Sequence, residues 1–257
     1  MNSSPQTLCT ALLKVGGSIL DNPEDTIRLS EALVSLGRIE RIVVFTGGGK
    51  LAKRIKANQR ARDSDFMACW HATTLALDAN AGLLASHSPM FAVARSMADI
   101  LQAHDRRRIP IFAPAQALFS SLWFTPNWVA TTDTMGLYFG RDMGARRYVI
   151  VTDVDGVCPH APGADKEVEP ILKMTVEELE ALPSSKLDAA FPIHFRRHPI
   201  ETFVVNGKVP QRVVDASRGR LPFGTYIPSD SALLRQESAT LERYDRDLVE
   251  AEPLGSV

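Results

Sequence analysis

The chain has 257 residues, 45% of them hydrophobic and 23% charged, which is enough to form the core of one large α/β domain or of two closely joined lobes. Its formal net charge of −1 gives no support for a nucleic-acid or membrane-surface partner. The first residues lack the basic and apolar segments of a signal peptide, and no apolar run reaches the roughly 18 residues of a membrane span. With three widely spaced cysteines, we expect a cytoplasmic protein with reduced thiols.

The first part of the chain alternates strand and helix signals. Apolar, β-branched runs predict strands at residues 11–16 and 39–45, with a helix at 24–36 between them. Each strand ends in a glycine turn, Gly16-Gly17-Ser18 after the first and Gly47-Gly48-Gly49 after the second. A basic helix is expected directly after the second turn. Its basic side chains either form a solvent-exposed face of the helix or attract an anionic substrate.

The middle of the chain continues the alternation, with a helix, a strand, a helix and a strand expected at 66–86, 90–94, 97–104 and 109–114. Thr131-Thr132-Asp133-Thr134 then predicts the start of a helix that ends near Gly144. Thr131 or Thr132 would cap this helix, and Asp133 in its first turn would complement the helix dipole.

A third glycine turn, Thr152-Asp153-Val154-Asp155-Gly156-Val157, follows a strand predicted at 146–151. Farther on, Thr175 and Glu178 form a capping box that predicts a short helix, and Lys186-Leu187-Asp188 precedes another helix. A strand, a helix and an edge strand are expected at 202–205, 213–217 and 224–227. The polar residues after Ser229 indicate a tail or a surface helix.

Glycine turns at strand ends are typical of an α/β sheet whose carboxyl edge holds a phosphate-rich ligand. Phosphoryl transfer needs cations and N–H donors directed at the phosphoryl oxygens, and a group that keeps the cations in place. Lys14 at the end of the first strand, the two glycine turns and Asp133 could supply that set. The sequence contains no Walker loop, protein-kinase motif, GxGxxG loop, GxSxG motif, HExxH motif or Cys/His metal cluster.

LLKVGGS, VVFTGGGK, TTDT and VIVTDVDGV, in that order, resemble the amino acid kinase superfamily. The resemblance covers about Leu12 to Ile227 and implies an α/β fold, a three-layer αβα sandwich with a mainly parallel central sheet. It implies a phosphoryl-acceptor lobe at 1–130, an ATP-binding lobe at 131–230 and a tail at 231–257, with both lobes on one continuous sheet. It also implies ATP and Mg²⁺ as cofactors, with Mg²⁺ held mainly through the ATP phosphates, a small-molecule substrate, and a homo-oligomer, either a dimer or a hexamer.

The same resemblance implies roles for individual residues. Lys14 would stabilise the transferring phosphoryl group, Asp133 would orient the lysines, and Lys186 falls near the place of a second catalytic lysine in several members. The phosphates and the acceptor would be bound by Gly16, Gly17, Ser18, Gly47, Gly48 and Gly49. The nucleotide site would be lined by Thr152, Asp153, Asp155, Gly156 and Val157.

Three stretches, CWHATTLALDANAGLLA, RIPIFAPAQALF and TPNWVATTDTMGLYFG, resemble the branch that contains the kinase of 5-(aminomethyl)-3-furanmethanol phosphate, which makes a diphosphate in methanofuran-type cofactor synthesis. VVNGKVPQRVVDASRGRLPFGTYI is similar to the C-terminal end of molybdenum storage protein subunits, which bind ATP and oxyanions. Our leading hypothesis is a kinase whose acceptor is a phosphate monoester or a carboxylate. Two alternatives are a nucleotide-dependent oxyanion-binding or storage protein and a uridylate-type nucleoside monophosphate kinase.

Overall fold

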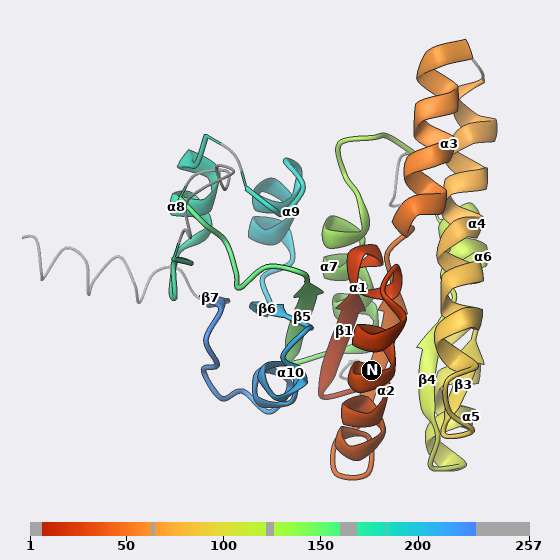
Figure 1. Cartoon of the computed structure of the whole chain (residues 1–257), viewed down its shortest axis with the longest axis vertical. Helices are drawn as coiled ribbons and strands as arrows, with labels where there is room; N and C mark the ends of the chain where they lie inside the picture. Colours follow the sequence, from red (N-terminus) through yellow and green to blue (C-terminus); the bar gives the residue numbers. More distant parts are fainter. Residues whose placement is uncertain (1–6, 63–64, 122–125, 160–168, 184, 230–257) are drawn as a thin grey trace, which may run out of the picture.

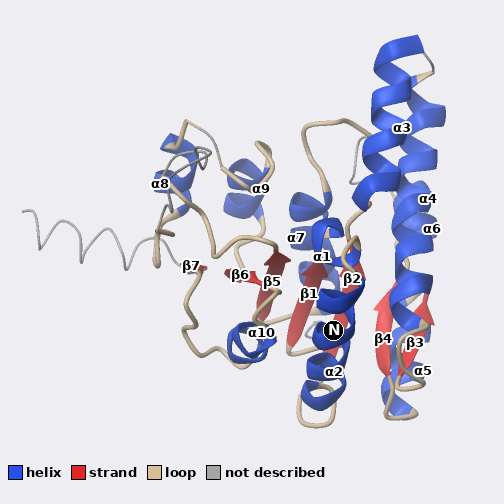
Figure 2. Cartoon of the chain, in the orientation of Figure 1, coloured by secondary structure: helices blue, strands red, loops and turns tan. Residues whose placement is uncertain are grey.

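The computed structural model describes residues 7–62, 65–121, 126–159, 169–183 and 185–229, with a seven-stranded sheet in the order β3-β4-β2-β1-β5-β6-β7 (Figure 2). The central strand, β1, is Ala11–Val15. Five further strands run in the same direction as β1: β2 (Ile42–Thr46), β3 (Phe91–Ala94), β4 (Ile109–Phe112), β5 (Arg147–Thr152) and β6 (Glu201–Asn206). The edge strand β7 (Thr225–Ile227) is antiparallel to β6. The predicted mainly parallel α/β sheet is confirmed.

Successive residues of the inner strands face opposite sides of the sheet and build two separate cores. Leu12 contributes to a core with helices α7 (Thr132–Met143) and α9 (Phe191–Arg197). Leu13 contributes to the other core, with α2 (Pro23–Leu36) and α10 (Pro210–Ser217). The helices therefore cover both faces of the sheet and form the expected three-layer αβα sandwich (Figure 1).

The remaining described helices lie between these strands and around the edge of the sheet. They are α1 (Gly17–Leu20), α3 (Gly49–Arg62), α4 (Phe66–Ala85), α5 (Met97–Asp105), α6 (Ala115–Phe119) and α8 (Val176–Ala181). Figure 1 shows α3 and α4 side by side as a hairpin that extends beyond the carboxyl end of the sheet. The capping box of Thr175 and Glu178 is present at the start of α8, as predicted. None of the described helices is both long and apolar enough to cross a membrane.

The structure differs from the sequence-based expectations at several element ends. The second strand begins at Ile42 rather than Ile39, whose side chain is 63% exposed in the loop after α2. Gly17 does not remain in an open turn, because it begins the one-turn helix α1. Helix α6 was not expected from the sequence. The proposed tail at 231–257 lies outside the described residues. The division at residue 130 into an acceptor lobe and an ATP-binding lobe stays a prediction. Residues on both sides of this division share one sheet, because β1 pairs with β2 and with β5.

Candidate active site

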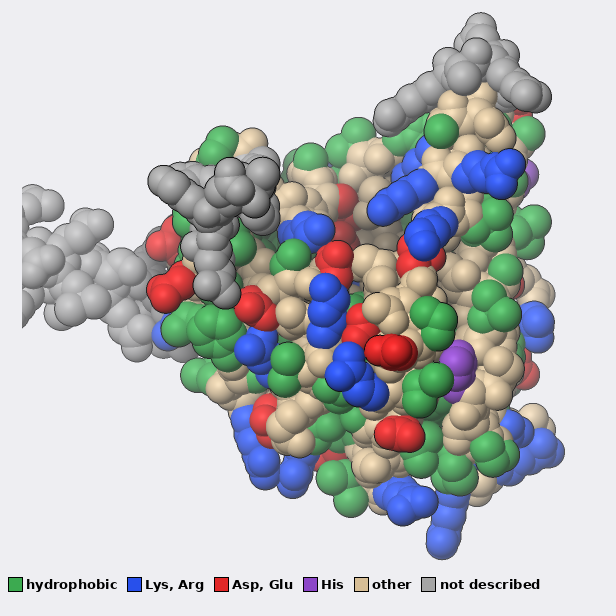
Figure 3. Space-filling model, viewed as in Figure 1, with side chains coloured by type: hydrophobic (Ala, Val, Ile, Leu, Met, Phe, Trp, Pro, Cys, Tyr) green, Lys and Arg blue, Asp and Glu red, His purple; other side chains and the backbone are tan. Residues whose placement is uncertain are grey.

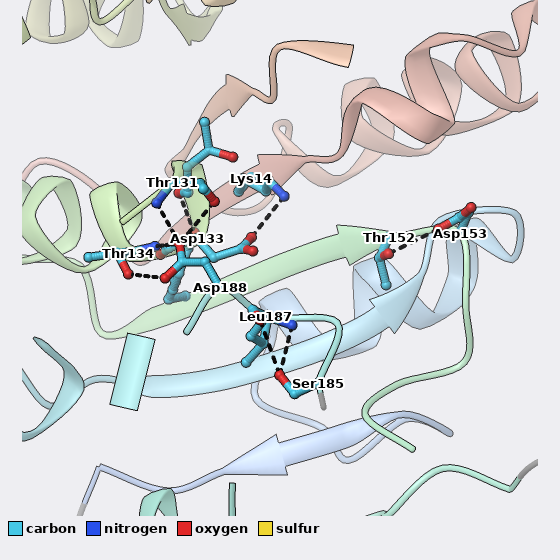
Figure 4. A network of polar contacts seen from close by, with 11 residues as sticks. Lys14, Thr131, Asp133, Thr134, Thr152, Asp153, Ser185, Leu187 and Asp188 are labelled. Carbon is cyan, nitrogen blue, oxygen red and sulfur yellow. Dashed lines mark hydrogen bonds and ion pairs between the residues drawn. The ribbon is translucent and has the colours of Figure 1, made fainter. Parts of the chain in front are cut away.

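The three central strands, β2, β1 and β5, carry their glycine turns to one edge of the sheet. They are parallel and in register, so that Lys14 on β1 lies between Phe45 on β2 and Ile150 on β5. Parallel strands end at the same edge, and the segments that follow them are therefore neighbours. Figure 4 shows Lys14 and the Thr152–Asp153 segment near this edge. The turns that were predicted from separate parts of the sequence thus form one surface.

The first two glycine turns are in direct backbone contact. A Cβ on Gly17 would lie 2.1 Å from the Cα of Gly49, a distance that only a residue without a side chain permits. Gly49 has a φ of +56°, in the left-handed region that favours glycine. The Nδ2 atom of Asn80 donates a 2.7 Å hydrogen bond to the carbonyl of Gly47 and fixes the second turn to α4. The two turns are therefore positioned together, and a side chain at either contact would separate them.

Lys14 and Asp133 form an ion pair at the centre of this edge. Lys14 Nζ lies 2.8 Å from Asp133 Oδ1, and the two side chains are only 12% and 9% exposed. Asp133 is in the first turn of α7, and the hydroxyl of Tyr148 donates a 3.1 Å hydrogen bond to its backbone carbonyl. Low exposure strengthens the attraction between the charges and restricts the lysine to one position. The structure thus brings together the two residues predicted to work as a pair, and their catalytic role stays a prediction.

The start of α7 is held by Asp188, a residue that sequence reasoning missed. Its Oδ2 atom accepts hydrogen bonds from the backbone N–H of Thr131 (2.8 Å), the hydroxyl of Thr131 (2.9 Å) and the backbone N–H of Thr134 (3.0 Å). Its Oδ1 atom accepts from the hydroxyl of Thr134 at 2.5 Å (Figure 4). Burial and the nearby charge of Asp133 raise the pKa of Asp188 above its usual value.

This arrangement corrects the predicted cap of the helix. Thr131 occupies the N-cap position, but its side chain makes no capping hydrogen bond to the helix and instead donates to Asp188. The carboxylate 57 residues away performs the capping that a Ser, Thr, Asp or Asn at the N-cap normally performs. No local pattern in the sequence links the two segments, so only the fold could identify the partner.

Lys186, the predicted second lysine, pairs with Asp153 after β5. Lys186 Nζ lies 3.5 Å from Asp153 Oδ1, with side chains that are 50% and 31% exposed. Partial burial raises the pKa of Asp153, but the Lys186 ammonium and hydrogen bonds that include the hydroxyls of Ser18 and Thr152 outweigh it and lower the pKa below its usual value. The structure thus gathers the exposed Lys186 and the partly buried Ser18, Thr152 and Asp153 on one part of the edge.

The rest of the third turn is part of the structural framework. Asp155 accepts a 2.9 Å hydrogen bond from Asn206 Nδ2 and forms an ion pair with the guanidinium of Arg212. The Asn206 hydrogen bond and the arginine lower the pKa of Asp155, even though partial burial opposes them. Gly156 adopts a φ of +148°, and Val157 is fully buried. The Asp155 side chain is 43% exposed, whereas the side chain of Val157 is buried, and the place of both residues in a nucleotide site stays a prediction.

A pocket beside the Lys14–Asp133 pair is lined by aromatic and polar side chains. Gly48, Trp70, Trp128 and Thr132 are among its walls, and Lys56 from the basic helix α3 also lines it. Lys56 Nζ lies 4.8 Å from the centroid of the Trp128 ring, a distance typical of a cation–π contact. One charge of the basic helix is therefore placed to meet an anion. Only its position after a glycine turn hinted at this in the sequence.

The described residues contain no group of three or more His, Cys, Asp or Glu side chains that could hold a metal ion.

Residues 10–206 match the family model described as amino acid kinase family. Among curated relatives, [5-(aminomethyl)furan-3-yl]methyl phosphate kinase of Methanocaldococcus jannaschii is 24% identical over 81% of this chain and 93% of its own. A uridylate kinase of Methanothrix thermoacetophila is 27% identical over 80% of this chain and 93% of its own. The crystal structure of uridylate kinase from Archaeoglobus fulgidus superposes with a TM-score of 0.67 at 23% identity, and covers 85% of this chain and 99% of that one.

The chain matches kinases along nearly their whole length. Together with the three-layer αβα fold and the edge of glycine turns around Lys14, this similarity defines a phosphotransferase of the kinase class. The chain belongs to the amino acid kinase family.

Proposed function

We propose that this protein transfers the γ-phosphoryl group of ATP to a small phosphate monoester, with an (aminomethyl)furan phosphate as the first candidate acceptor. The observation that carries the proposal is the 2.8 Å pair of Lys14 and Asp133 beside two touching glycine turns. In this position the ammonium would lie next to a phosphoryl group that accumulates negative charge during transfer. Asp133 would hold the ammonium in place without itself taking a proton.

The acceptor would occupy the pocket beside this pair. Trp70 and Trp128 supply aromatic walls for a small ring, and Lys56 and the backbone of Gly48 would offer a cation and an N–H to its phosphate. The similarity to the M. jannaschii enzyme supports a furan-type acceptor. A carboxylate acceptor would use the same cation and N–H groups.

ATP would lie on the opposite side of Lys14, over the ends of β5 and β6. Lys186 is exposed there beside the partly buried Asp153, Ser18 and Thr152, and the lysine would contact the nucleotide phosphates. Mg²⁺ would be bound by the β- and γ-phosphates, where it supplies positive charge as the phosphoryl group leaves.

Substitution of the central lysine tests the proposal. We expect Lys14→Ala to lower kcat by roughly 100- to 1,000-fold, the usual effect of removing one group that stabilises a transition state. Lys173→Ala is the matched control, because Lys173 is exposed and lies next to the edge strand β7. Circular dichroism would confirm that both variants fold. Full turnover by folded Lys14→Ala protein would overturn the proposed mechanism.

The acceptor is tested by measuring ADP release with ATP·Mg²⁺ against a panel of phosphorylated and carboxylated metabolites that includes aminomethylfuran phosphates. Turnover with an aminomethylfuran phosphate well above that with UMP is the expected result. The alternative is a uridylate-type kinase, favoured by the similarity to two archaeal uridylate kinases. A preference for UMP would establish that alternative instead.

The second alternative, a nucleotide-dependent oxyanion store, rests on the C-terminal sequence similarity described above. It requires ATP or a metal oxyanion to accompany the purified protein and requires that no acceptor stimulates ADP release. Mass spectrometry of the purified protein, together with the acceptor panel, separates a store from a kinase.

A further inference from the structure

A second pocket lies at the end of the sheet opposite the candidate active site. Its walls include the 37–41 segment between α2 and β2 and the 104–108 segment, which runs from the last two residues of α5 to the start of β4. Strands β2 and β4 begin at these segments, whereas the ends of β1, β2 and β5 form the candidate site. A ligand in this pocket would therefore be separate from the phosphoryl-transfer centre.

The pocket concentrates positive charge in a chain whose formal net charge is −1. Its charged side chains are Arg38, Arg41, Arg107, Arg108, Glu40 and Asp105. Four guanidinium groups against two carboxylates leave a local excess of cations. Figure 3 shows Lys and Arg side chains at the lower end of the molecule, where the α2–β2 and α5–β4 segments lie in Figure 1. We call this site the arginine pocket.

The four arginines are not used alike by the protein. Arg108 is fixed to the backbone, because its Nε donates a 3.1 Å hydrogen bond to the carbonyl of Pro89 and its Nη2 donates to that of Phe91. Arg38, Arg41 and Arg107 are exposed and form no ion pair with any carboxylate among the described residues. Three guanidinium groups are therefore available to a ligand beside one that the fold holds still.

Arg107 occupies a backbone conformation that an arginine rarely adopts. Its φ is +55°, the only positive value at a non-glycine position in the described chain. It follows the last turn of α5, where the N–H of Arg108 donates a 2.8 Å hydrogen bond to the carbonyl of Ala103. Glycine is the usual residue at this position of a helix end, because any side chain is strained there. Strained positions of this kind are concentrated at binding sites, where the side chain has a use that the fold does not require.

His104 adds an uncharged polar atom to the wall. Its Nε2 atom is buried and has no hydrogen-bond partner among the described residues. Burial and the charge of Arg41 lower the pKa of this imidazole to about 4, so that it is neutral at pH 7 and can donate or accept one hydrogen bond.

We infer that the arginine pocket binds a small anion carrying two or more phosphate groups, at a site independent of the candidate active site. Guanidinium groups match phosphate oxygens in paired hydrogen bonds, and several of them converge here on a concave surface. A compact diphosphate or triphosphate presents two or three phosphate groups to the three available guanidinium groups, so that each guanidinium can form paired hydrogen bonds.

Isothermal titration calorimetry with inorganic pyrophosphate tests the inference on the full-length protein. The wild type should show two classes of site, and the double variant Arg38→Ser/Arg41→Ser should lose one of them or bind there roughly 10- to 100-fold more weakly. Lys14→Ala should keep the arginine-pocket site and weaken the other. The matched control is Arg146→Ser/Arg218→Ser, which removes the same charge from exposed positions outside the pocket.

Unchanged pyrophosphate binding by Arg38→Ser/Arg41→Ser, or equal losses in both double variants, would overturn the inference. A single class of site that only the pocket variant loses would support the arginine pocket and count against pyrophosphate binding at the candidate active site. If the pocket variant does not fold, Arg107→Gly provides an independent test. Glycine relieves the strained backbone, so this variant should unfold at the same or a higher urea concentration than the wild type while binding pyrophosphate more weakly. Unchanged binding by Arg107→Gly would equally contradict the proposed site.

Discussion

Removing the carboxylate of Asp188 should destabilise the first turn of α7, the helix that carries Asp133. Asp188 accepts hydrogen bonds from two backbone N–H groups and two hydroxyls at the start of α7. In Asp188→Ala the hydroxyls can rotate to other acceptors, but the N–H groups of Thr131 and Thr134 lose their partner. The first turn of α7 would then be free to move, and Lys14 would lose its fixed position.

The magnitude follows from these contacts. Loss of a helix N-cap costs about 1 kcal/mol and up to about 2, and each donor left without a partner in a buried site costs about 1–3 kcal/mol. The pKa of Asp188 is raised by burial and by the charge of Asp133, so removing an ionised carboxylate also relieves some repulsion. The net loss in the free energy of unfolding should therefore be about 2–3 kcal/mol.

Asp188→Asn separates geometry from charge. Its amide oxygen can accept the hydrogen bonds made to Oδ2, and its NH₂ group can donate to the hydroxyl of Thr134. We expect this variant to lose less than about 1 kcal/mol of unfolding free energy. It should keep most of the wild-type kcat. Asp188→Ala should instead lower kcat at least about tenfold with little change in KM, because Asp188 positions Asp133 and does not touch substrate.

Urea unfolding followed by circular dichroism, with steady-state kinetics on the same samples, measures both effects. Asp142→Ala is the matched control, since Asp142 lies at the other end of α7 in an exposed pair with Arg141. The reasoning is refuted if Asp188→Ala unfolds within about 0.5 kcal/mol of the wild type, the range of an ordinary surface substitution.

Three further predictions concern other parts of the structure. Gly17→Ala should cost at least about 2 kcal/mol of unfolding free energy, because its Cβ would lie 2.1 Å from backbone of the neighbouring turn. A Cβ added at Gly82 would have no atom within 4 Å, so Gly82→Ala should stabilise α4 by about 0.5–1 kcal/mol. Urea unfolding that ranks the two variants in the reverse order would contradict the described contact between the glycine turns. Lys186→Ala should raise KM for ATP while changing stability by less than about 1 kcal/mol, because its pair with Asp153 is half-exposed, and unchanged ATP kinetics would remove Lys186 from the site. Because the pKa of His104 is lowered, its contribution to stability is complete above pH 6.5 and is progressively lost toward pH 4. In urea unfolding at several pH values, the difference in unfolding free energy between wild type and His104→Gln should therefore shrink by about 1–3 kcal/mol over that interval. A constant difference would contradict this prediction.

Much of the architecture was predictable from the sequence because its signals are local. Apolar runs and periodicity located every strand in the described part of the chain, with ends off by up to three residues, as at Ile39. The short helix α6 was missed, since five residues carry too little periodicity to identify a helix. The start of α7 was located correctly by Thr131 and Asp133, although the group that caps it was not.

The chemical elements of the candidate site were likewise visible as residue types. A lysine at the end of a buried strand, glycines after parallel strands and an acid in the first turn of a helix each have a local physical meaning. The family resemblance implied that Asp133 would orient the lysines, and the structure pairs it with Lys14. The family resemblance predicted Lys186, which the fold places against Asp153.

The sequence by itself therefore determined the alternation of strands and helices, the glycine turns and the lysine at the end of the first strand, because backbone freedom, capping and hydrophobic periodicity act within a few residues. The three-layer αβα arrangement was expected from the family resemblance. Only the tertiary structure decided that Asp188 holds the start of α7, that Lys56 and Trp128 line one pocket, and that four arginines from two segments converge at the opposite end of the sheet. Each of these depends on contacts between segments tens of residues apart. Such contacts arise from how the helices and strands pack, and no local pattern encodes them.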